Sequence, residues 1–143
     1  MRQIDKYIQL LIDEYKKQLS KPNPKWPPDV QKALIGIHDH LFDQKLTVQW
    51  LLKNCYISNK NFSGKFKYYV GFGVKQYILT HRLQLSKKLL LKCENHRLSI
   101  SEVGFEVGFS NYASFNRAFN KAFGSPPGKW LKGSGNEAAS ESE

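Results

Sequence analysis

Residues 99–130 read SISEVGFEVGFSNYASFNRAFNKAFGSPPGKW, and they contain the clearest helix signals of the chain. Ser99 and Glu102 form a capping box, in which a hydroxyl and a carboxylate three residues on close the first turn of a helix. Gly108 ends the short apolar pattern that follows and suits the left-handed turn in which a chain reverses direction. The apolar pattern then resumes until Gly124 and two prolines stop it. These signals predict two short helices joined by a tight turn.

The apolar residues of this stretch fall on one face of each predicted helix. We expect the first helix to bury Ile100, Val103 and Val107. We expect Ser110 to cap the second helix, which buries Phe115 and Phe119. A helix, a tight turn and a capped helix form a helix-turn-helix, whose second helix can lie in the major groove of DNA.

The same pattern occurs once more, earlier in the chain. At an offset of 52 residues, which becomes 53 after the serine, the matched pairs are Leu46 with Leu98, Val48 with Ile100, Ser58 with Ser110, Phe62 with Phe115, Phe66 with Phe119 and Gly71 with Gly124. In this first copy we expect Thr47 and Ser58 to cap the two helices. Tyr56 replaces Gly108, which predicts a strained left-handed residue or a different turn.

Residues 74–92 connect the two copies and have leucines along one side, which predicts a continuous helix. At 1.5 Å per residue the helix would be roughly 28 Å long. One turn of B-DNA is about 34 Å. A stiff connector of this length could hold two recognition helices about one turn apart on one face of a duplex.

The residues before the first copy predict two more helices. Ile4, Ile8, Leu11 and Tyr15 form an amphipathic pattern, and a proline-rich linker follows it. We expect Asp29 to cap the next helix, which ends near Phe42 and exposes the polar residues His38 and His40. The arm is either a partner-binding helix or the remnant of a preceding domain.

The predicted architecture is all-α and homeodomain-like, with two helix-turn-helix subdomains joined by a linker helix and preceded by an amphipathic helical arm. The expected boundaries are 1–28 for the arm and linker, 29–73 for the first subdomain, 74–92 for the linker helix, 93–132 for the second subdomain and 133–143 for an acidic flexible tail.

The charge pattern favours a nucleic-acid partner. The chain has 22 Lys and Arg against 12 Asp and Glu, a formal net charge of +10. No acidic residue occurs from Gln44 to Cys93, although ten basic residues do. An ordinary solvated surface mixes both signs, whereas a phosphate-facing surface does not. An anionic membrane could also attract such a stretch.

Composition and motifs argue against other classes of protein. No apolar stretch approaches the roughly 20 residues of a membrane span, and no signal peptide opens the sequence. Cys55 and Cys93 fit no metal-ligand spacing, so we expect reduced core residues in a cytoplasmic, nucleoid-associated protein. The sequence has no phosphate loop, metal-ligand set or nucleophile–base pair, and we expect His81 and His96 to be isolated polar residues at the surface. We therefore expect no enzyme activity, metal or cofactor.

The quoted stretch closely resembles the signature segment of the AraC/XylS family of transcription regulators. The first copy and residues 77–91 match the rest of that family's DNA-binding domain, so the resemblance covers about residues 29–131. It implies two helix-turn-helix subdomains bridged by a helix, and control of transcription, usually activation. Tyr56, Gly64 and Gly104 depart from the family pattern. Gly64 corresponds to Arg117, so the first unit has no base-reading side chain at this position.

The faces opposite the buried aromatics are the predicted DNA-binding surface. In the second unit Arg117 could fork onto guanine, Asn116 could pair with adenine and Ala113 could pack on a thymine methyl. The full predicted set is Lys60, Asn61, Ser63, Lys67, Tyr112, Ala113, Asn116, Arg117, Asn120 and Lys121. The resemblance also implies groove positions for Lys60, Ser63, Ala113, Asn116 and Arg117.

The expected partners are double-stranded DNA and RNA polymerase, together with a missing sensor domain or a second copy bound through residues 1–20. The residues before the first copy are too few for a sizeable ligand pocket, so the chain is either a small stand-alone regulator or a fragment. A helical protein-interaction module with only non-specific nucleic-acid affinity is the alternative reading.

Overall fold

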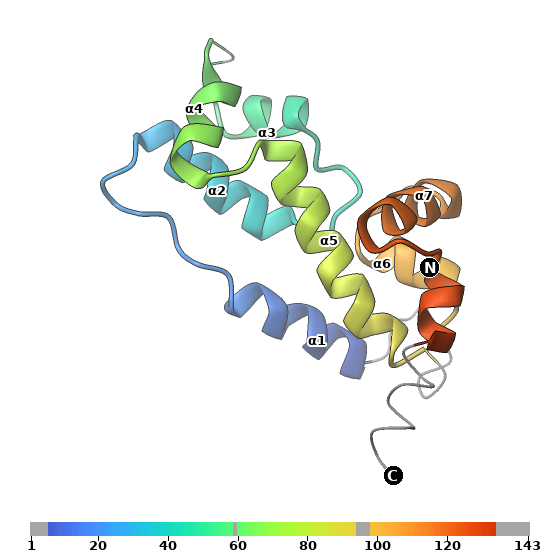
Figure 1. Cartoon of the computed structure of the whole chain (residues 1–143). Coiled ribbons are helices and arrows are strands. Elements are labelled where there is room, and N and C mark those ends of the chain that lie inside the picture. Colours follow the sequence, from blue (N-terminus) through green and yellow to red (C-terminus); the bar gives the residue numbers. More distant parts are fainter. Residues whose placement is uncertain (1–5, 59, 94–97, 134–143) are drawn as a thin grey trace.

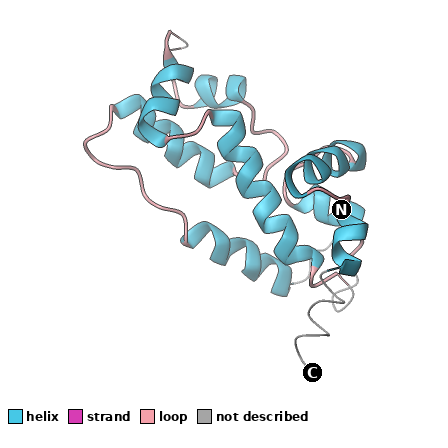
Figure 2. Ribbon diagram, viewed as in Figure 1, coloured by secondary structure: helices cyan, strands magenta, loops and turns pink. Residues whose placement is uncertain are grey.

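The structure, a computed structural model, describes residues 6–58, 60–93 and 98–133. Over these residues the regular structure is helical and contains no strand, which confirms the all-α prediction (Figure 2). Residues 127–133 are also helical. The other helices are α1 (Lys6–Lys17), α2 (Pro28–His40), α3 (Val48–Asn54), α4 (Phe62–Val70), α5 (Val74–Leu90), α6 (Ile100–Glu106) and α7 (Tyr112–Phe123).

Helices α2, α3 and α4 enclose a first hydrophobic core beside the start of α5 (Figure 1). Phe62 and Phe66 from α4 are fully buried in it, as the sequence pattern predicted. The other fully buried members include Val30, Ala33, Ile37, Leu41 and Leu51. Burying an aromatic or aliphatic side chain of this size stabilises a fold by roughly 1.5–3 kcal/mol, so these residues orient α4.

A second core lies between α6, α7, the later part of α5, and α1. Phe115 and Phe119 from α7 are fully buried beside Val103 and Val107. The linker helix therefore contributes to both cores, through Val74 and Ile78 to the first and through residues such as Leu85 and Leu89 to the second. It is uninterrupted, as predicted, but ends at Leu90, so it is roughly 26 Å long.

The helix caps correct three predictions. Thr47 and Ser99 cap α3 and α6 as expected, and Ser99 forms the full capping box with Glu102. Ser110 does not cap α7, because the Asn111 Oδ1 accepts the Ser114 N–H at 2.8 Å. Ser58 does not cap α4, which begins only after Asn61.

Asp29 is not the cap of α2 either. The helix begins at Pro28, whose fixed φ and missing N–H suit a first helical position, and Pro27 precedes it. The Asp29 carboxylate instead pairs with the Lys65 Nζ of α4 at 2.9 Å. This ion pair lowers the pKa of Asp29.

Both helix-turn-helix turns contain a left-handed residue. Gly108 has φ of 111°, and Tyr56 has φ of 55° at the matching position, so Tyr56 is the strained residue of the two predicted alternatives. Gly104 lets α6 approach α7 closely, because a Cβ there would lie 2.9 Å from the Phe115 Cδ2.

Helix α1 packs along α5 rather than projecting from the body of the protein (Figure 1). Ile8 is fully buried and Ile12 is almost so, both in the second core. The Tyr15 hydroxyl lies 2.6 Å from the His81 Nδ1. The apolar stripe of the predicted arm is therefore covered by this chain's own linker helix, while Ile4 lies outside the described residues.

Two histidines occupy sites that the sequence analysis did not predict. His38 and His81 were expected at the surface, but both are half-buried. The His38 Nε2 lies 2.6 Å from the Tyr77 hydroxyl, and the Tyr77 ring packs edge-on against His81. The predictions were wrong because α1, α2 and α5 converge here. His96 and the acidic tail lie outside the described residues.

Because these two half-buried histidines are neutral in the folded protein, we expect the fold to be sensitive to acid. Burial, aided by His81, lowers the pKa of His38 to about 4, and burial also lowers that of His81. In the unfolded chain a histidine titrates near 6.5, so on acidification the unfolded state takes up protons first. The stability from the two neutral rings is therefore present above about pH 6.5 and is lost as pH falls towards 4.

We expect the melting temperature of the protein to fall between pH 7 and pH 5. The fall should be smaller for His38→Gln, which can still hydrogen-bond to Tyr77 but does not titrate. Thermal melts followed by circular dichroism check this, with the exposed-site substitution Lys53→Gln as the control. If the melting temperatures of the wild type and of His38→Gln fell equally between pH 7 and pH 5, His38 would not contribute to the acid sensitivity.

Candidate nucleic-acid interface

Helix α4 presents an exposed face opposite its buried phenylalanines. This face holds Ser63, Gly64, Lys67 and Tyr68, all of them exposed, and Tyr68 keeps 80% of its surface accessible. Two predicted contact residues, Ser63 and Lys67, therefore lie on it. The face carries one positive charge and, at Gly64, no side chain at all.

The other two predicted contacts of the first unit lie just ahead of α4. Lys60 and Asn61 are exposed, and Asn61 precedes the helix in a left-handed conformation with φ of 59°. They are near the N-terminal end of the recognition helix, as expected, but they are not part of it. The later start of α4 shortens the first recognition helix relative to α7.

Helix α7 presents a longer exposed face. Ala113, Arg117, Asn120 and Lys121 are exposed on the side away from the buried phenylalanines. Tyr112, at 40% exposure, lies at the first turn of the helix. Five of the six predicted residues of the second unit are therefore accessible to a macromolecular partner.

Asn116 is the exception in α7. Its side chain is half-buried, and its Oδ1 is fully covered without a hydrogen-bond partner among the described residues. The prediction that the Asn116 side chain points outward was therefore wrong. The residue follows Phe115 directly and sits at the edge of the buried stripe, so reaching a base edge would require a change in its χ angles.

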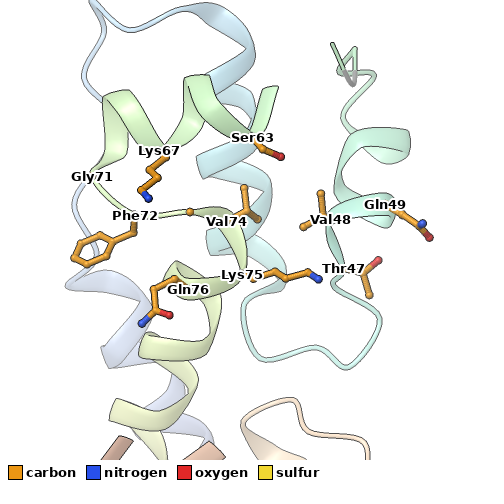
Figure 3. Close-up of a pocket in the computed structure, with 11 residues that line it drawn as sticks. Thr47, Val48, Gln49, Ser63, Lys67, Gly71, Phe72, Val74, Lys75 and Gln76 are labelled. Carbon is orange, nitrogen blue, oxygen red and sulfur yellow. The ribbon is translucent and has the colours of Figure 1, made fainter. Parts of the chain in front are cut away.

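A hollow of about 940 Å³ adjoins the exposed face of α4. Figure 3 shows Lys67 entering it from α4, and Lys75 reaching from α5 towards Thr47 and Val48 at the start of α3. The hollow also meets Gly73, at the N-terminal end of α5. Lysine side chains and the positive end of a helix dipole both favour an anion such as a phosphate.

Sequence reasoning did not select Thr47 or Lys75 as contacts. The acid-free stretch included Lys75, but only the packing of α3 and α4 against α2, together with that of α4 against α5, brings the α3 N-terminus beside this lysine. Helical periodicity alone identifies the face of one helix and cannot show which helix ends meet.

Both recognition helices border the same side of α5. Gln76 lines the hollow beside α4 and also a second hollow, of about 310 Å³, beside α7. The second hollow continues past Thr80 on α5 and is closed by Lys121 and Phe123 of α7. Since Gln76 and Thr80 are one helical turn apart, α4 and α7 flank one continuous strip of the linker helix.

The charges near this strip are positive. No residue lining the two hollows is acidic, and Lys67, Lys75 and Lys121 are all exposed. Acidic side chains gather at a separate groove between α1, the end of α2 and α6, which Asp39, Asp43 and Glu106 line. The protein thus carries an unneutralised cationic side near its recognition helices, suited to a polyanion.

The two cysteines are covered thiols, and the described residues contain no cluster that could hold a metal ion. Cys93 is buried and Cys55 is half-buried, and both are free thiols. Burial raises the pKa of Cys93 to about 11 and also raises that of Cys55, which keeps both thiols protonated. No described group of three or more His, Cys, Asp or Glu could hold a metal. None of the described helices is long and apolar enough to span a bilayer.

Residues 51–133, more than half of the chain, match the sequence model of a family described as a helix-turn-helix domain. The chain belongs to the AraC/XylS family. This family is one of transcription regulators, and the chain contains its helix-turn-helix domain.

Regulators from several bacteria resemble this AraC/XylS-family chain. The Msm operon regulatory protein of Streptococcus mutans is 30% identical over 128 residues, which cover 89% of this chain and 45% of that protein. The uncharacterized HTH-type transcriptional regulator YobQ of Bacillus subtilis is 34% identical over 95 residues, which cover 66% of this chain and 38% of that protein. The chain spans less than half the length of these relatives.

Solved structures share the fold. The C-terminal domain of AraT, a response regulator from Geobacillus stearothermophilus, superposes with a TM-score of 0.66 at 25% identity, covering 76% of this chain and 87% of that domain. The DNA-binding domain of AdpA, solved in complex with a target DNA, superposes with a TM-score of 0.63 at 23% identity, covering 75% and 93%.

Gly64 provides a test of how α4 is built. It lies within the helix, and a Cβ there would meet nothing within 4 Å. We expect Gly64→Ala to raise the free energy of unfolding by about 0.5–1 kcal/mol, because alanine loses less backbone entropy in a helix. Urea denaturation measures the change.

Gly71→Ala is the matched control. A Cβ at Gly71 also meets open space, but φ is 97° there, so we expect this substitution to destabilise the protein by roughly 1 kcal/mol. A destabilising Gly64→Ala would mean that residue 64 is not helical in solution.

Proposed function

We propose that this chain binds one DNA duplex through α4 and α7, placed in successive segments of the major groove, and regulates transcription from that site. The observation that carries this proposal is the strip of α5 that both recognition helices flank. The linker helix is roughly 26 Å long, which is somewhat shorter than the turn of about 34 Å of B-DNA.

The two helices would contribute differently. On α7, the exposed Arg117 can donate a bidentate fork to guanine O6 and N7, and Ala113 can pack on a thymine methyl. Asn116 would pair with adenine after its rotamer changes. Asn120 and Lys121 lie further along the helix and would contact phosphates.

On α4, the exposed face has few groups that read bases. Gly64 offers none, and Lys60, Asn61 and Ser63 lie at or before the first turn. Lys67 borders the large hollow together with Lys75 and would meet the phosphate backbone there. The first unit would therefore contribute mainly electrostatic affinity for DNA, and the second unit would contribute most of the sequence specificity.

The protein would activate transcription by contacting RNA polymerase, in the cytoplasm at the nucleoid, and would have no enzyme activity of its own. A sensor domain or a second copy that binds residues 1–20 would meet an α1 whose buried stripe already faces α5. Such a partner would therefore use the exposed Tyr7 and Leu10.

Salt dependence tests the DNA-binding mode. A protein that neutralises roughly six to ten phosphates loses about 10³–10⁵ in affinity between 50 and 200 mM salt. We expect a loss of this order in a fluorescence anisotropy titration with duplex DNA. Affinity that does not respond to salt would instead favour a helical protein-interaction module.

The division of roles predicts different effects of two substitutions. Arg117→Ala should cost about 1–3 kcal/mol on the selected site and relax the preference for one base pair, since the bidentate fork is lost. Lys67→Ala should weaken binding to all duplexes alike and make the salt slope shallower by about one unit. Binding to duplexes selected from a random pool, and to their single-base variants, measures both.

Gln18→Ala, at an exposed position just after α1 and outside both hollows, is the control, because it changes no charge. If Lys67→Ala changed base preference while Arg117→Ala weakened binding uniformly, the roles would be the reverse of those proposed.

A further inference from the structure

The Arg82 side chain, on α5, holds the chain that leaves α2. Its Nε donates to the Leu41 carbonyl oxygen at 2.8 Å, and its Nη2 donates to the Asp43 carbonyl oxygen at 2.8 Å. Leu41 is fully buried in the first core, and Asp43 lies in the loop that leads to α3. One guanidinium thereby fixes two backbone groups of the first unit.

The same guanidinium faces the turn of the second unit. A Cβ at Gly108 would lie 2.7 Å from both Cζ and Nε of Arg82, so Gly108 is in close contact with it. Gly108 is buried in the turn between α6 and α7, three residues before the Asn111 cap of α7. Arg82 therefore sits between the loop of one helix-turn-helix unit and the turn of the other.

We propose that Arg82 is a positioning residue that sets the second recognition helix relative to the first unit, and so sets the spacing at which the two units read DNA. This inference rests on the proposed function of two units on one duplex. Arg82 is half-buried, and its guanidinium donates to two backbone carbonyl oxygens of this chain.

The chemistry of the site requires arginine. The planar guanidinium forks onto two carbonyl oxygens and presents a flat surface to Gly108, whereas a lysine ammonium is a single point donor. Burial lowers the pKa of Arg82, and the two carbonyl acceptors compensate for the lost hydration. Gly108 is thus required for two reasons, its positive φ and its contact with Arg82.

Other contacts between the units would keep the protein folded without this fork. Tyr15 and Phe42 pack against both hydrophobic cores and against each other, with ring centroids 5.7 Å apart. Replacing Arg82 by lysine keeps the charge and should loosen the relation between the units while each core remains intact. Circular dichroism and thermal melts confirm folding before the measurements below.

The first experiment uses the full chain and DNA duplexes selected from a random pool with the wild type. Arg82→Lys should bind the full duplex about tenfold more weakly than the wild type does, because the linkage between the units is lost. For duplexes that keep only one half-site, the loss of affinity should be no more than about twofold. It should also lose discrimination against duplexes whose half-sites are moved by one base pair. Lys88→Arg, a charge-conserving change on α5, should leave all three measurements unchanged.

Two results would overturn the proposal. One is an equal loss on single half-sites and full duplexes, and the other is unchanged spacing discrimination. If the wild type selected no duplex at all, the proposed function would fail instead, and a measurement without DNA would still test Arg82.

That measurement is the distance distribution between spin labels on the two units. Labels at Lys53→Cys and Lys129→Cys, with Cys55 and Cys93 replaced by alanine, report on α3 and on the end of the second unit. We expect a narrow distribution for the chain with Arg82 and a broader one for Arg82→Lys. Equal distributions would refute the positioning role regardless of DNA binding.

Discussion

Helix α5 belongs to both hydrophobic cores at once, and the rest of the structure depends on this shared packing. Val74 and Ile78 enter the first core, and Leu85 and Leu89 enter the second. Because a helix resists bending, side chains buried at its two ends restrict how the units can move relative to each other. This restriction keeps α4 and α7 beside the same strip of α5. Neither unit by itself could fix the position of both helices.

The electrostatics follow from the same arrangement. The recognition side has no carboxylate among the residues that line its two hollows, while Asp39, Asp43 and Glu106 line a separate groove. A phosphate backbone approaching α4 and α7 therefore meets uncompensated lysines. The asymmetry between the units is steric as well as electrostatic, since α4 begins late and exposes Gly64 where α7 exposes Arg117.

Polar side chains reinforce the junction between the units. Arg82 joins the α2–α3 loop to the turn at Gly108, and Tyr15 joins α1 to His81. His38 and Tyr77 form a second half-buried pair between α2 and α5. These groups are far apart in the sequence, and each becomes buried only because its partner helix covers it.

The sequence alone determined the two helix-turn-helix units, the linker helix, the buried phenylalanines and the exposed positions of α4 and α7, because helical periodicity and capping residues act over a few neighbouring residues. It misplaced the caps at Ser58, Ser110 and Asp29, because α4 begins only at Phe62, Asn111 caps α7, and α2 begins at Pro28. Tertiary structure decided the half-burial of His38, His81 and Asn116, the docking of α1 and the contact of Arg82 with Gly108. Those features depend on which helices meet across long sequence separations, and no local pattern carries that information.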